Sequence, residues 1–237
     1  MIRVGMSTQE PLYDAISDEY EEHAKTSPYN AQYDRPSMLG MLGDLQGAQV
    51  LDAGCGPGFY ASELLARGAT VTAFDQSSKM VALARSRLAN RAELRVHDLS
   101  QPIDWIADAT QDRVVLALVL HYLDDRVAAL KELHRVLRPG GKLVLSTHHP
   151  TLEWQLRGGS YFATELIEET WNTGWKMRYW RLPLEQSCAE FAEAGFLTES
   201  IVEPRPIPEM RESDPIRYEK LMTSPNFINF RLVKQAR

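Results

Sequence analysis

The sequence of 237 residues has few cysteines, no long apolar run and no dense cluster of basic residues. Its two cysteines, Cys55 and Cys188, provide neither a disulfide framework nor a zinc-ligand spacing, which is typical of a reduced compartment. No apolar stretch approaches the roughly 18 residues of a membrane span, and residues 1–7 lack the apolar core of a signal peptide. We therefore expect a cytoplasmic protein without a membrane span.

The lack of a dense basic cluster, together with the excess of acidic residues, also bears on binding partners. The formal net charge is −6, whereas nucleic-acid scaffolds gain much of their affinity from basic side chains that neutralise phosphates. The sequence thus argues against a nucleic-acid partner. Because 44% of the residues are hydrophobic, the chain can bury a substantial core. We expect a single domain that is monomeric or homodimeric.

Short apolar runs alternate with amphipathic helical patterns between residues 48 and 148. They predict strands at 48–53, 70–74, 93–96, 114–120 and 142–147, helices at 58–66, 77–88 and 124–137, and two later strands at 196–202 and 226–233. Repeated β-α units with short connections favour an α/β fold with a doubly wound, mostly parallel, seven-stranded, Rossmann-like sheet. Ligands of such sheets bind beyond the carboxyl ends of the strands.

Two regions flank this alternating core, which we place at 47–148 of the single domain 1–237. Residues 1–46 have helical spacing and predict a helical lid in front of the sheet. Residues 149–182 form an aromatic, irregular insert in which 164–171 and 176–181 are predicted to pair as a hairpin. The remaining residues, 183–237, are expected to complete the sheet.

A glycine-rich turn, Gly54-Cys55-Gly56-Pro57-Gly58, follows the first predicted strand and opens the first helix of the core. Glycine allows a sharp turn and a close approach of ligand to backbone, and a helix that begins there presents free N–H groups. A dinucleotide fingerprint needs a third glycine where this chain has Phe59. Asp75, at the end of the second strand, is suited to accept hydrogen bonds from ribose hydroxyls. The turn therefore indicates a nucleoside rather than a pyrophosphate.

Five segments, in order, resemble the motifs of class I S-adenosylmethionine-dependent methyltransferases of the small-molecule branch, with a core similar to ubiquinone and menaquinone methyltransferases. They are 50–59, 72–77, 97–99, 112–122 and 137–143, and together they span about residues 48–148. The resemblance implies S-adenosyl-L-methionine as cofactor and methyl transfer to O, N or C of a small-molecule acceptor. A nicotinamide-dependent oxidoreductase and a binding module without turnover are the alternatives.

The resemblance also implies cofactor-binding residues. They are Tyr20, Arg35, Asp52, Gly54, Cys55, Gly56, Asp75, Gln76, Met80, Asp98, Leu99, Ala117 and Leu118. Asp52 is expected near the methionine ammonium group, Asp75 at the ribose, Asp98 at the adenine amino group, and Arg35 or Tyr20 at the carboxylate. Read alone, Asp98 is equally a turn residue, Met80 a core contact, and the tyrosines of the lid its packing residues.

Catalysis of methyl transfer needs a general base only where the acceptor must lose a proton. His121 follows the fourth strand and His148 and His149 follow the fifth, so all three are candidate bases, with packing as the alternative for His121. Asp124 and Asp125 are interpreted as helix N-caps rather than magnesium ligands, and no metal site is predicted. The tryptophans between 154 and 180 predict an acceptor wall, unless they form a dimer interface or ordinary core.

Overall fold

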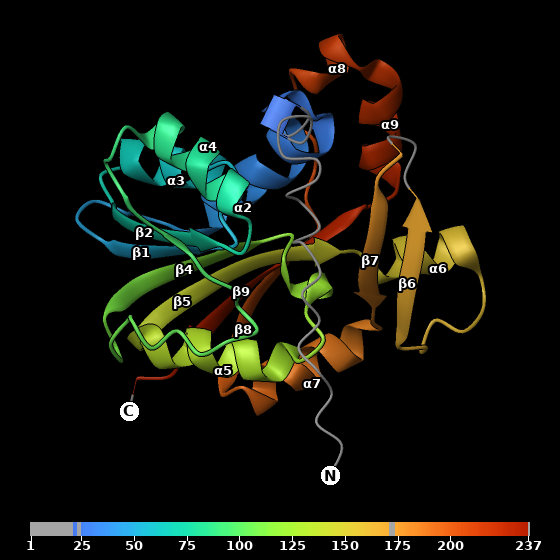
Figure 1. The fold of residues 1–237 in the computed structure, drawn as a ribbon. Helices are drawn as coiled ribbons and strands as arrows, with labels where there is room; N and C mark the ends of the chain where they lie inside the picture. Colours follow the sequence, from blue (N-terminus) through green and yellow to red (C-terminus); the bar gives the residue numbers. More distant parts are fainter. Residues whose placement is uncertain (1–20, 23–24, 171–173, 237) are drawn as a thin grey trace.

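The computed structural model describes residues 21–22, 25–170 and 174–236. Its main sheet has seven strands in the order β3-β2-β1-β4-β5-β9-β8 (Figure 1). The strands are β1 (Gln49–Ala53), β2 (Thr70–Asp75), β3 (Glu93–Val96), β4 (Gln111–Ala117), β5 (Leu137–His148), β8 (Phe196–Val202) and β9 (Phe227–Lys234). Strand β9 is antiparallel to β5 and β8, whereas the other neighbouring pairs are parallel. The predicted Rossmann-like fold class is confirmed.

Helices cover both faces of this sheet, as its apolar strands require. On one face lie α2 (Arg35–Met41), α3 (Phe59–Ala66) and α4 (Ser78–Leu88), and on the other lie α5 (Arg126–Val136) and α7 (Leu184–Glu193) (Figure 1). Met38, Leu64 and Ala84 are buried in the core of the first face. Leu130 and Phe191 are buried in the core of the second. The order of the strands brings the ends of β1 and β4 side by side in the middle of the sheet.

Strand β4 ends earlier than the sequence predicts. The predicted strand 114–120 stops at Ala117, and the backbone of Leu118 has a φ of +56°. Such a conformation is uncommon for a residue with a side chain and interrupts an extended strand. The chain then turns into the short 3-10 helix η2 (Leu120–Tyr122). As a result, residues 118–122 lie over the carboxyl end of the sheet instead of within it.

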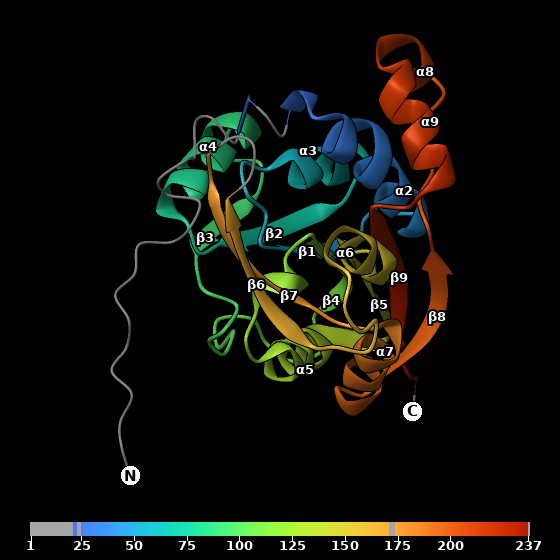
Figure 2. The ribbon, with the colours of Figure 1, turned by 90° about the vertical axis from the view of Figure 1, so that its right-hand side faces the viewer.

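The insert has more regular structure than the sequence predicts. The predicted hairpin is confirmed: strands β6 (Glu165–Thr170) and β7 (Lys176–Arg181) pair in antiparallel fashion, and Figure 2 shows them in front of the main sheet. The irregular segment expected from residue 150 begins instead with helix α6 (Pro150–Arg157). His149 caps this helix by accepting a hydrogen bond from the Thr151 N–H, and Pro150 occupies its first turn. Proline in the first turn is a recognised helix-start signal, whereas histidine is not among the preferred N-cap residues.

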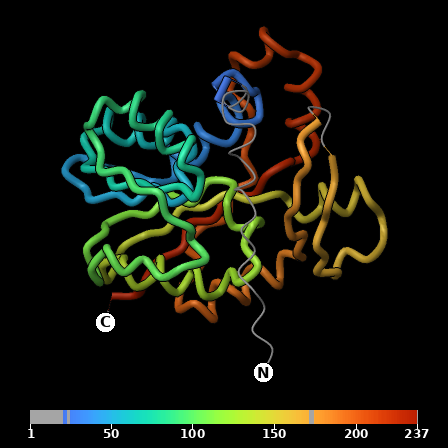
Figure 3. Tube along the Cα trace, viewed as in Figure 1, coloured from blue at the N-terminus to red at the C-terminus, as the bar shows by residue number. Residues whose placement is uncertain are grey.

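The C-terminal segment contains two helices that the periodicity did not predict, α8 (Met210–Ser213) and α9 (Pro215–Thr223). Asp214 caps α9 and Pro215 opens it. In Figure 3 this segment lies beside the N-terminal π-helix η1 (Asn30–Asp34). Tyr33 packs with Met210 and Leu221 there. The first part of the predicted helical lid, residues 1–20 and 23–24, lies outside the described residues.

Candidate functional site

The glycine turn begins where β1 ends. The N–H groups of Gly54 and Cys55 both donate to the Phe74 carbonyl of β2, at 2.8 and 2.9 Å. Gly54 has a φ of +72°, and a Cβ added there would lie 2.5 Å from a methyl group of Val119. Gly56 has a φ of +51°, and a Cβ there would meet nothing within 4 Å. Gly54 therefore allows the turn to pack against the chain after β4, and Gly56 faces open space.

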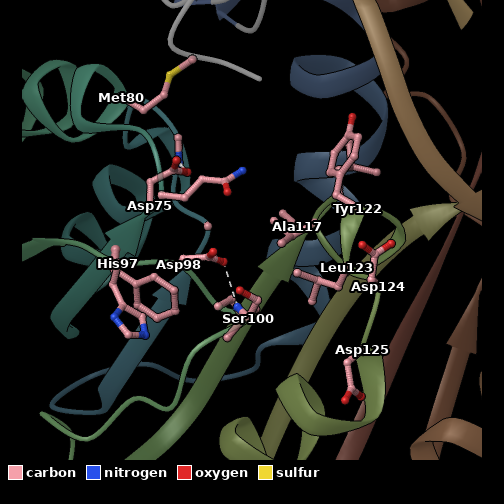
Figure 4. Close-up of a pocket in the computed structure, with 17 residues that line it drawn as sticks. Asp75, Met80, His97, Asp98, Ser100, Ala117, Tyr122, Leu123, Asp124 and Asp125 are labelled. Atoms are coloured by element: carbon pink, nitrogen blue, oxygen red, sulfur yellow. Dashed lines mark hydrogen bonds between the residues drawn. The ribbon is translucent and has the colours of Figure 1, made fainter. Parts of the chain in front are cut away.

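A cavity of about 390 Å³ lies at the carboxyl ends of the strands, next to this turn. Figure 4 shows Asp75, Met80, His97 and Asp98 on one side and Tyr122 to Asp125 on the other, with Ala117 between them. Most of the predicted cofactor residues line it: Gly54, Gly56, Asp75, Gln76, Met80, Asp98, Leu99, Ala117 and Leu118. The cavity lies where the fold class places ligands.

Two acidic side chains at this cavity are held by backbone N–H groups. The carboxylate oxygens of Asp75 accept hydrogen bonds from Gly56 at 2.8 Å and from Ser77 at 2.9 Å. Asp98 accepts from the Ser100 N–H at 2.9 Å, the bond drawn in Figure 4. The bonds from Gly56 and Ser77 fix the orientation of the Asp75 carboxylate at the cavity. Asp98 is thus a turn residue that also lines the cavity.

A second cavity of about 60 Å³ lies on the other side of the turn. It shares Gly54, Gly56, Ala117 and Leu118 with the larger cavity. Its further lining residues are Asn30, Asp34, Arg35, Cys55, Pro57, Phe59 and Tyr60. The Arg35 guanidinium lies 4.7 Å from the Phe59 ring centroid. The two cavities therefore meet at the glycine turn and at the end of β4.

Asp52, in contrast, lies beneath the turn and lines neither of these two cavities. Its side chain is buried, and burial raises its pKa to about 7 although the Ala61 N–H bonds to it. The nearby charge of Asp75 raises the pKa further. The Asp52 carboxyl group is a part of the core that supports the turn. Tyr20 is outside the described residues.

The three candidate bases occupy two different surroundings. His121 and His148 are stacked, with ring centroids 4.2 Å apart, and Nδ1 of His121 lies 3.1 Å from Oγ1 of Thr147. Burial lowers the pKa of both imidazoles, which favours their neutral form. His149 instead caps α6, and its Nε2 lies 3.1 Å from Glu203. None of the three lines either cavity at the glycine turn.

A buried polar cluster ties His148 to the insert. Nδ1 of His148 lies 3.5 Å from a carboxylate oxygen of Glu153, which is almost fully buried. Glu153 accepts a hydrogen bond from Arg157 at 2.9 Å. The hydroxyl of Tyr179, on β7, contacts Glu153 and Arg157 and donates to Glu169 at 2.8 Å. Helix α6, the hairpin and the end of β5 are thereby held together.

The far wall of the larger cavity is connected to the same hairpin. Asp124 accepts hydrogen bonds from the Trp180 indole at 2.8 Å and from Arg178 at 3.1 Å, and these bonds keep its pKa low. The cap of α5 is Asp125 alone, which accepts from the Ala128 N–H. Trp175 is buried inside the hairpin and Trp154 is half exposed. None of the tryptophans that the structure describes lines the larger cavity.

Several lining residues were not predicted: Phe74, His97, Ser100, Val119, Tyr122, Leu123, Asp124 and Asp125. His97 lies in the segment 97–99, next to Asp98, which the resemblance places at the adenine amino group. Its position in the sequence therefore indicates that it lies near the cavity. Residues 119–123 reach the cavity only because the chain bends at Leu118. No periodicity marks that bend.

This arrangement fits an adenosyl group joined to an amino acid. The volume of the larger cavity falls within the range of small-molecule sites, and its carboxylates are groups that can accept hydrogen bonds from hydroxyl and amino donors. The smaller cavity presents a guanidinium and an acid at the end of the same turn. Among the described residues, no group of three His, Cys, Asp or Glu side chains is placed to hold a metal ion. No helix in that same part of the chain is long and apolar enough to cross a membrane.

The strand order, the antiparallel β9 and the glycine turn define a class I methyltransferase fold. A solved S-adenosylmethionine-dependent methyltransferase from Mesorhizobium loti superposes with a TM-score of 0.75, at 22% identity, covering 89% of this chain and 99% of that one. Residues 51–145 match the methyltransferase domain family.

Two sequence relatives agree with that match. The malonyl-[acyl-carrier protein] O-methyltransferase of Pseudescherichia vulneris is 33% identical over 184 residues, which cover 72% of this chain and 70% of that protein. The demethylmenaquinone methyltransferase of Lactococcus lactis is 27% identical over 222 residues, which cover 84% and 82%. The chain belongs to the S-adenosylmethionine-dependent methyltransferases, and it is an enzyme that methylates a small-molecule acceptor.

Proposed function

We propose that the two joined cavities hold S-adenosylmethionine, with the adenosyl group in the larger cavity and the methionine portion in the smaller one. The observation that carries this proposal is the shared lining of the cavities by Gly54, Gly56, Ala117 and Leu118. A ligand that extends through both passes over the open face of Gly56, where no Cβ obstructs it. The cofactor supplies a methyl group bonded to a sulfonium centre.

On the adenosyl side, Asp75 accepts hydrogen bonds from the ribose hydroxyls, and Asp98 accepts from the adenine amino group. The Leu99 N–H donates to a ring nitrogen of the base, and Gln76 and Met80 flank it. The support is that all five residues line the same cavity, and that backbone N–H groups orient both carboxylates. Asp75 and Asp98 come from the ends of two neighbouring strands, β2 and β3.

On the methionine side, Arg35 binds the carboxylate, because a planar guanidinium matches a carboxylate with two parallel hydrogen bonds. Its contact with the Phe59 ring holds its planar group beside the glycine turn. Cys55 contributes its backbone to the same small cavity. Tyr20 remains a predicted second partner of the carboxylate.

The acceptor approaches from the side of η2 and the β6–β7 hairpin. This direction is supported by Tyr122, which lines the larger cavity and also packs against the apolar side of the hairpin. Where the acceptor carries a proton, we assign its removal to the His121–His148 pair, because a neutral imidazole has one nitrogen that can accept a proton. The Nε2 of His121 has no hydrogen-bond partner among the described residues. His149 is committed to Glu203 and α6, so we assign it a structural role.

The roles of 1–46 as a lid and of 149–182 as the acceptor wall belong to this proposal, as do a cytoplasmic location and a monomeric or homodimeric state. The two free cysteines, one of them buried, support a reducing compartment. The net charge of −6 supports the lack of a nucleic-acid partner.

The direct test is a pair of measurements on the whole chain. Calorimetry should show binding of S-adenosylhomocysteine and no comparable binding of NADH. A screen of metabolites with radiolabelled methyl donor should then identify an acceptor. Tight binding of NADH without S-adenosylhomocysteine would refute the proposed ligand.

For the base, turnover of His121→Gln and His148→Gln on that acceptor should fall while affinity for S-adenosylhomocysteine stays unchanged. His149→Gln serves as the matched control and should retain turnover. Full activity in the first two variants would remove the histidines from the mechanism.

A further inference from the structure

Asp34 is a buried acid on the wall of the smaller cavity. It is the last residue of η1 and stands at the N-cap of α2, yet its side chain makes no capping bond. It is 1% exposed. Oδ2 accepts hydrogen bonds from the Tyr60 hydroxyl at 2.7 Å and from Ser146 Oγ at 3.1 Å. Oδ1 is also buried and has no hydrogen-bond partner among the described residues.

Such an oxygen is costly to bury, because an ionised carboxylate needs partners for its lone pairs. A residue type well suited to cap α2 is used here for another purpose. The Asp34 carboxyl group is also held by a neighbouring hydroxyl. Ser146 Oγ donates to Asp34 and accepts from the Leu118 N–H at 3.2 Å. Asp34 is thereby connected to the bend after β4, which lies between the two cavities.

We propose that Asp34 receives the α-ammonium group of the cofactor's methionine portion, in the place that the family resemblance implies for Asp52. This inference rests on the proposed function and names the cationic partner within it. Asp34 lines the cavity that holds Arg35, whereas Asp52 does not. Adjacent acidic and basic residues thus match the ammonium and carboxylate of an α-amino acid.

The size of the smaller cavity agrees with that partner. Its volume of about 60 Å³ is several times the roughly 10–15 Å³ that one water needs. An amino-acid head group of a few non-hydrogen atoms fits, but a further ring does not. A cation next to the unpartnered Oδ1 would satisfy the buried oxygen.

The groups around Asp34 set the pH at which it can bind a cation. Burial raises the pKa of Asp34 to about 6, and Tyr60 from α3, Ser146 from β5, Arg35 from α2 and Asn229 from β9 oppose that rise. Above this pH the carboxylate is ionised and attracts an ammonium group. Below it the acid is neutral and the attraction is lost, while an α-ammonium group stays charged throughout pH 5–7.

The test uses two probes that share the adenosyl group. S-adenosylhomocysteine carries the amino-acid head group, and 5′-methylthioadenosine lacks it. Calorimetry at pH 7 should show Asp34→Asn binding S-adenosylhomocysteine about 10- to 100-fold more weakly than the unmodified chain, the range for losing a hydrogen-bonded charge. Affinity for 5′-methylthioadenosine should stay within twofold. Asp44→Asn, a change at an exposed acid after α2, should alter neither.

The pH profile provides a second readout. The unmodified chain should bind S-adenosylhomocysteine about tenfold more weakly at pH 5 than at pH 7, as one proton with a pKa of about 6 requires. In Asp34→Asn, the affinity for S-adenosylhomocysteine should change with pH no more than the affinity for 5′-methylthioadenosine does. Tyr60→Phe, which removes a bond that lowers the Asp34 pKa, should move the loss of affinity to higher pH.

Equal binding of S-adenosylhomocysteine by Asp34→Asn and the unmodified chain would overturn the assignment to Asp34 while leaving the proposed function standing. An unmodified chain that binds neither probe would refute the proposed function itself. If Asp34→Asn loses both probes through misfolding, Tyr60→Phe decides: an unshifted profile overturns the assignment, and an upward shift supports it.

Discussion

The two walls of the larger cavity are held in place in different ways. One wall is formed by the glycine turn and the ends of β2 and β3. Its acids accept hydrogen bonds from backbone N–H groups, as Asp75 does from Gly56 and Ser77. On the opposite wall, Asp124 is held by Arg178 and Trp180, more than fifty residues later. The first wall depends on backbone geometry and the second on contacts between distant side chains.

The buried titratable groups follow the same division. Next to the glycine turn the buried groups are acids, Asp34 and Asp52, whose pKa values are raised by burial. Next to the insert they are imidazoles, His121 and His148, whose pKa values are lowered by burial. Burial therefore shifts the pKa values toward the uncharged form in both regions, but it acts on acids in one and on bases in the other. The halves should respond differently to mutation and to pH.

The largest expected effect is at the turn. Gly54→Ala combines a left-handed backbone with a Cβ placed 2.5 Å from Val119, and we expect it to lower the free energy of unfolding by about 3 kcal/mol and to abolish S-adenosylhomocysteine binding. Gly43→Ala is the matched control, because Gly43 has a φ of +73° with open space around it. It should cost about 1 kcal/mol and retain binding. Chemical denaturation and calorimetry measure both; equal losses would show that packing against Val119 is unimportant.

The insert should be sensitive to its buried acid. Glu153→Ala leaves Arg157 and Tyr179 with fewer partners in a buried cluster, and we expect a loss of about 2 kcal/mol in the free energy of unfolding. Binding of S-adenosylhomocysteine should stay unchanged, because Glu153 lines neither cavity at the turn. The exposed Glu168→Ala change on the hairpin is the control. A loss of cofactor affinity in Glu153→Ala would contradict the separation of the two walls.

A smaller effect separates the two walls in binding. Asp75→Ala should weaken S-adenosylhomocysteine by roughly 1–3 kcal/mol, because it removes hydrogen bonds to a charged acceptor and frees two N–H groups of the turn. Asp124→Ala, on the opposite wall of the same cavity, should change that affinity by less than about 0.5 kcal/mol. Calorimetry on both variants gives the comparison. Unchanged affinity in Asp75→Ala would mean that the ribose is held elsewhere.

The pH dependence of stability should have opposite signs in the two halves. Asp52 binds its proton more tightly in the folded state, so its contribution to stability is present at low pH and is lost as the pH rises from about 4 toward its folded pKa of about 7. His148 has a lowered pKa, so its contribution is lost as the pH falls below about 6.5.

Denaturation of the ligand-free chain from pH 5 to 8 tests these signs. The unmodified chain should lose roughly 2–3 kcal/mol of stability through Asp52 between pH 5 and pH 8, and Asp52→Asn should remove that loss. His148→Gln should reduce the loss of stability on the acid side. Parallel pH profiles for the unmodified chain and both variants would refute the assignment of these groups.

Much of the first wall could be predicted from the sequence, because its elements are local. The turn at Gly54 and Gly56 follows directly from a strand, and Asp75 and Asp98 stand at the ends of the next two strands. Parallel strands with right-handed connections bring such ends to one edge of the sheet. The order of the residues along the chain is therefore enough to place them together.

The second wall and the smaller cavity could not be predicted in this way. The bend at Leu118, with its positive φ, has no glycine to announce it, and it moves residues 119–123 into the site. Helix α6 begins with Pro150, but its cap is His149, which is not among the preferred N-cap residues and gives no signal in the sequence. Asp34 looks like an ordinary helix cap until the structure shows Tyr60 and Ser146 around it.

The sheet, the glycine turn and the acids that line the larger cavity can be predicted from the sequence, because apolar periodicity and strand ends are properties of neighbouring residues. Arg35 was expected at the site, but the position of Asp34 on the cavity wall and of Asp52 outside it became visible only in the folded chain. The tertiary structure alone placed His121 against His148 and separated His149 from both. Burial and pairing of charged groups depend on side chains from distant strands and helices, and no local pattern of residues encodes them.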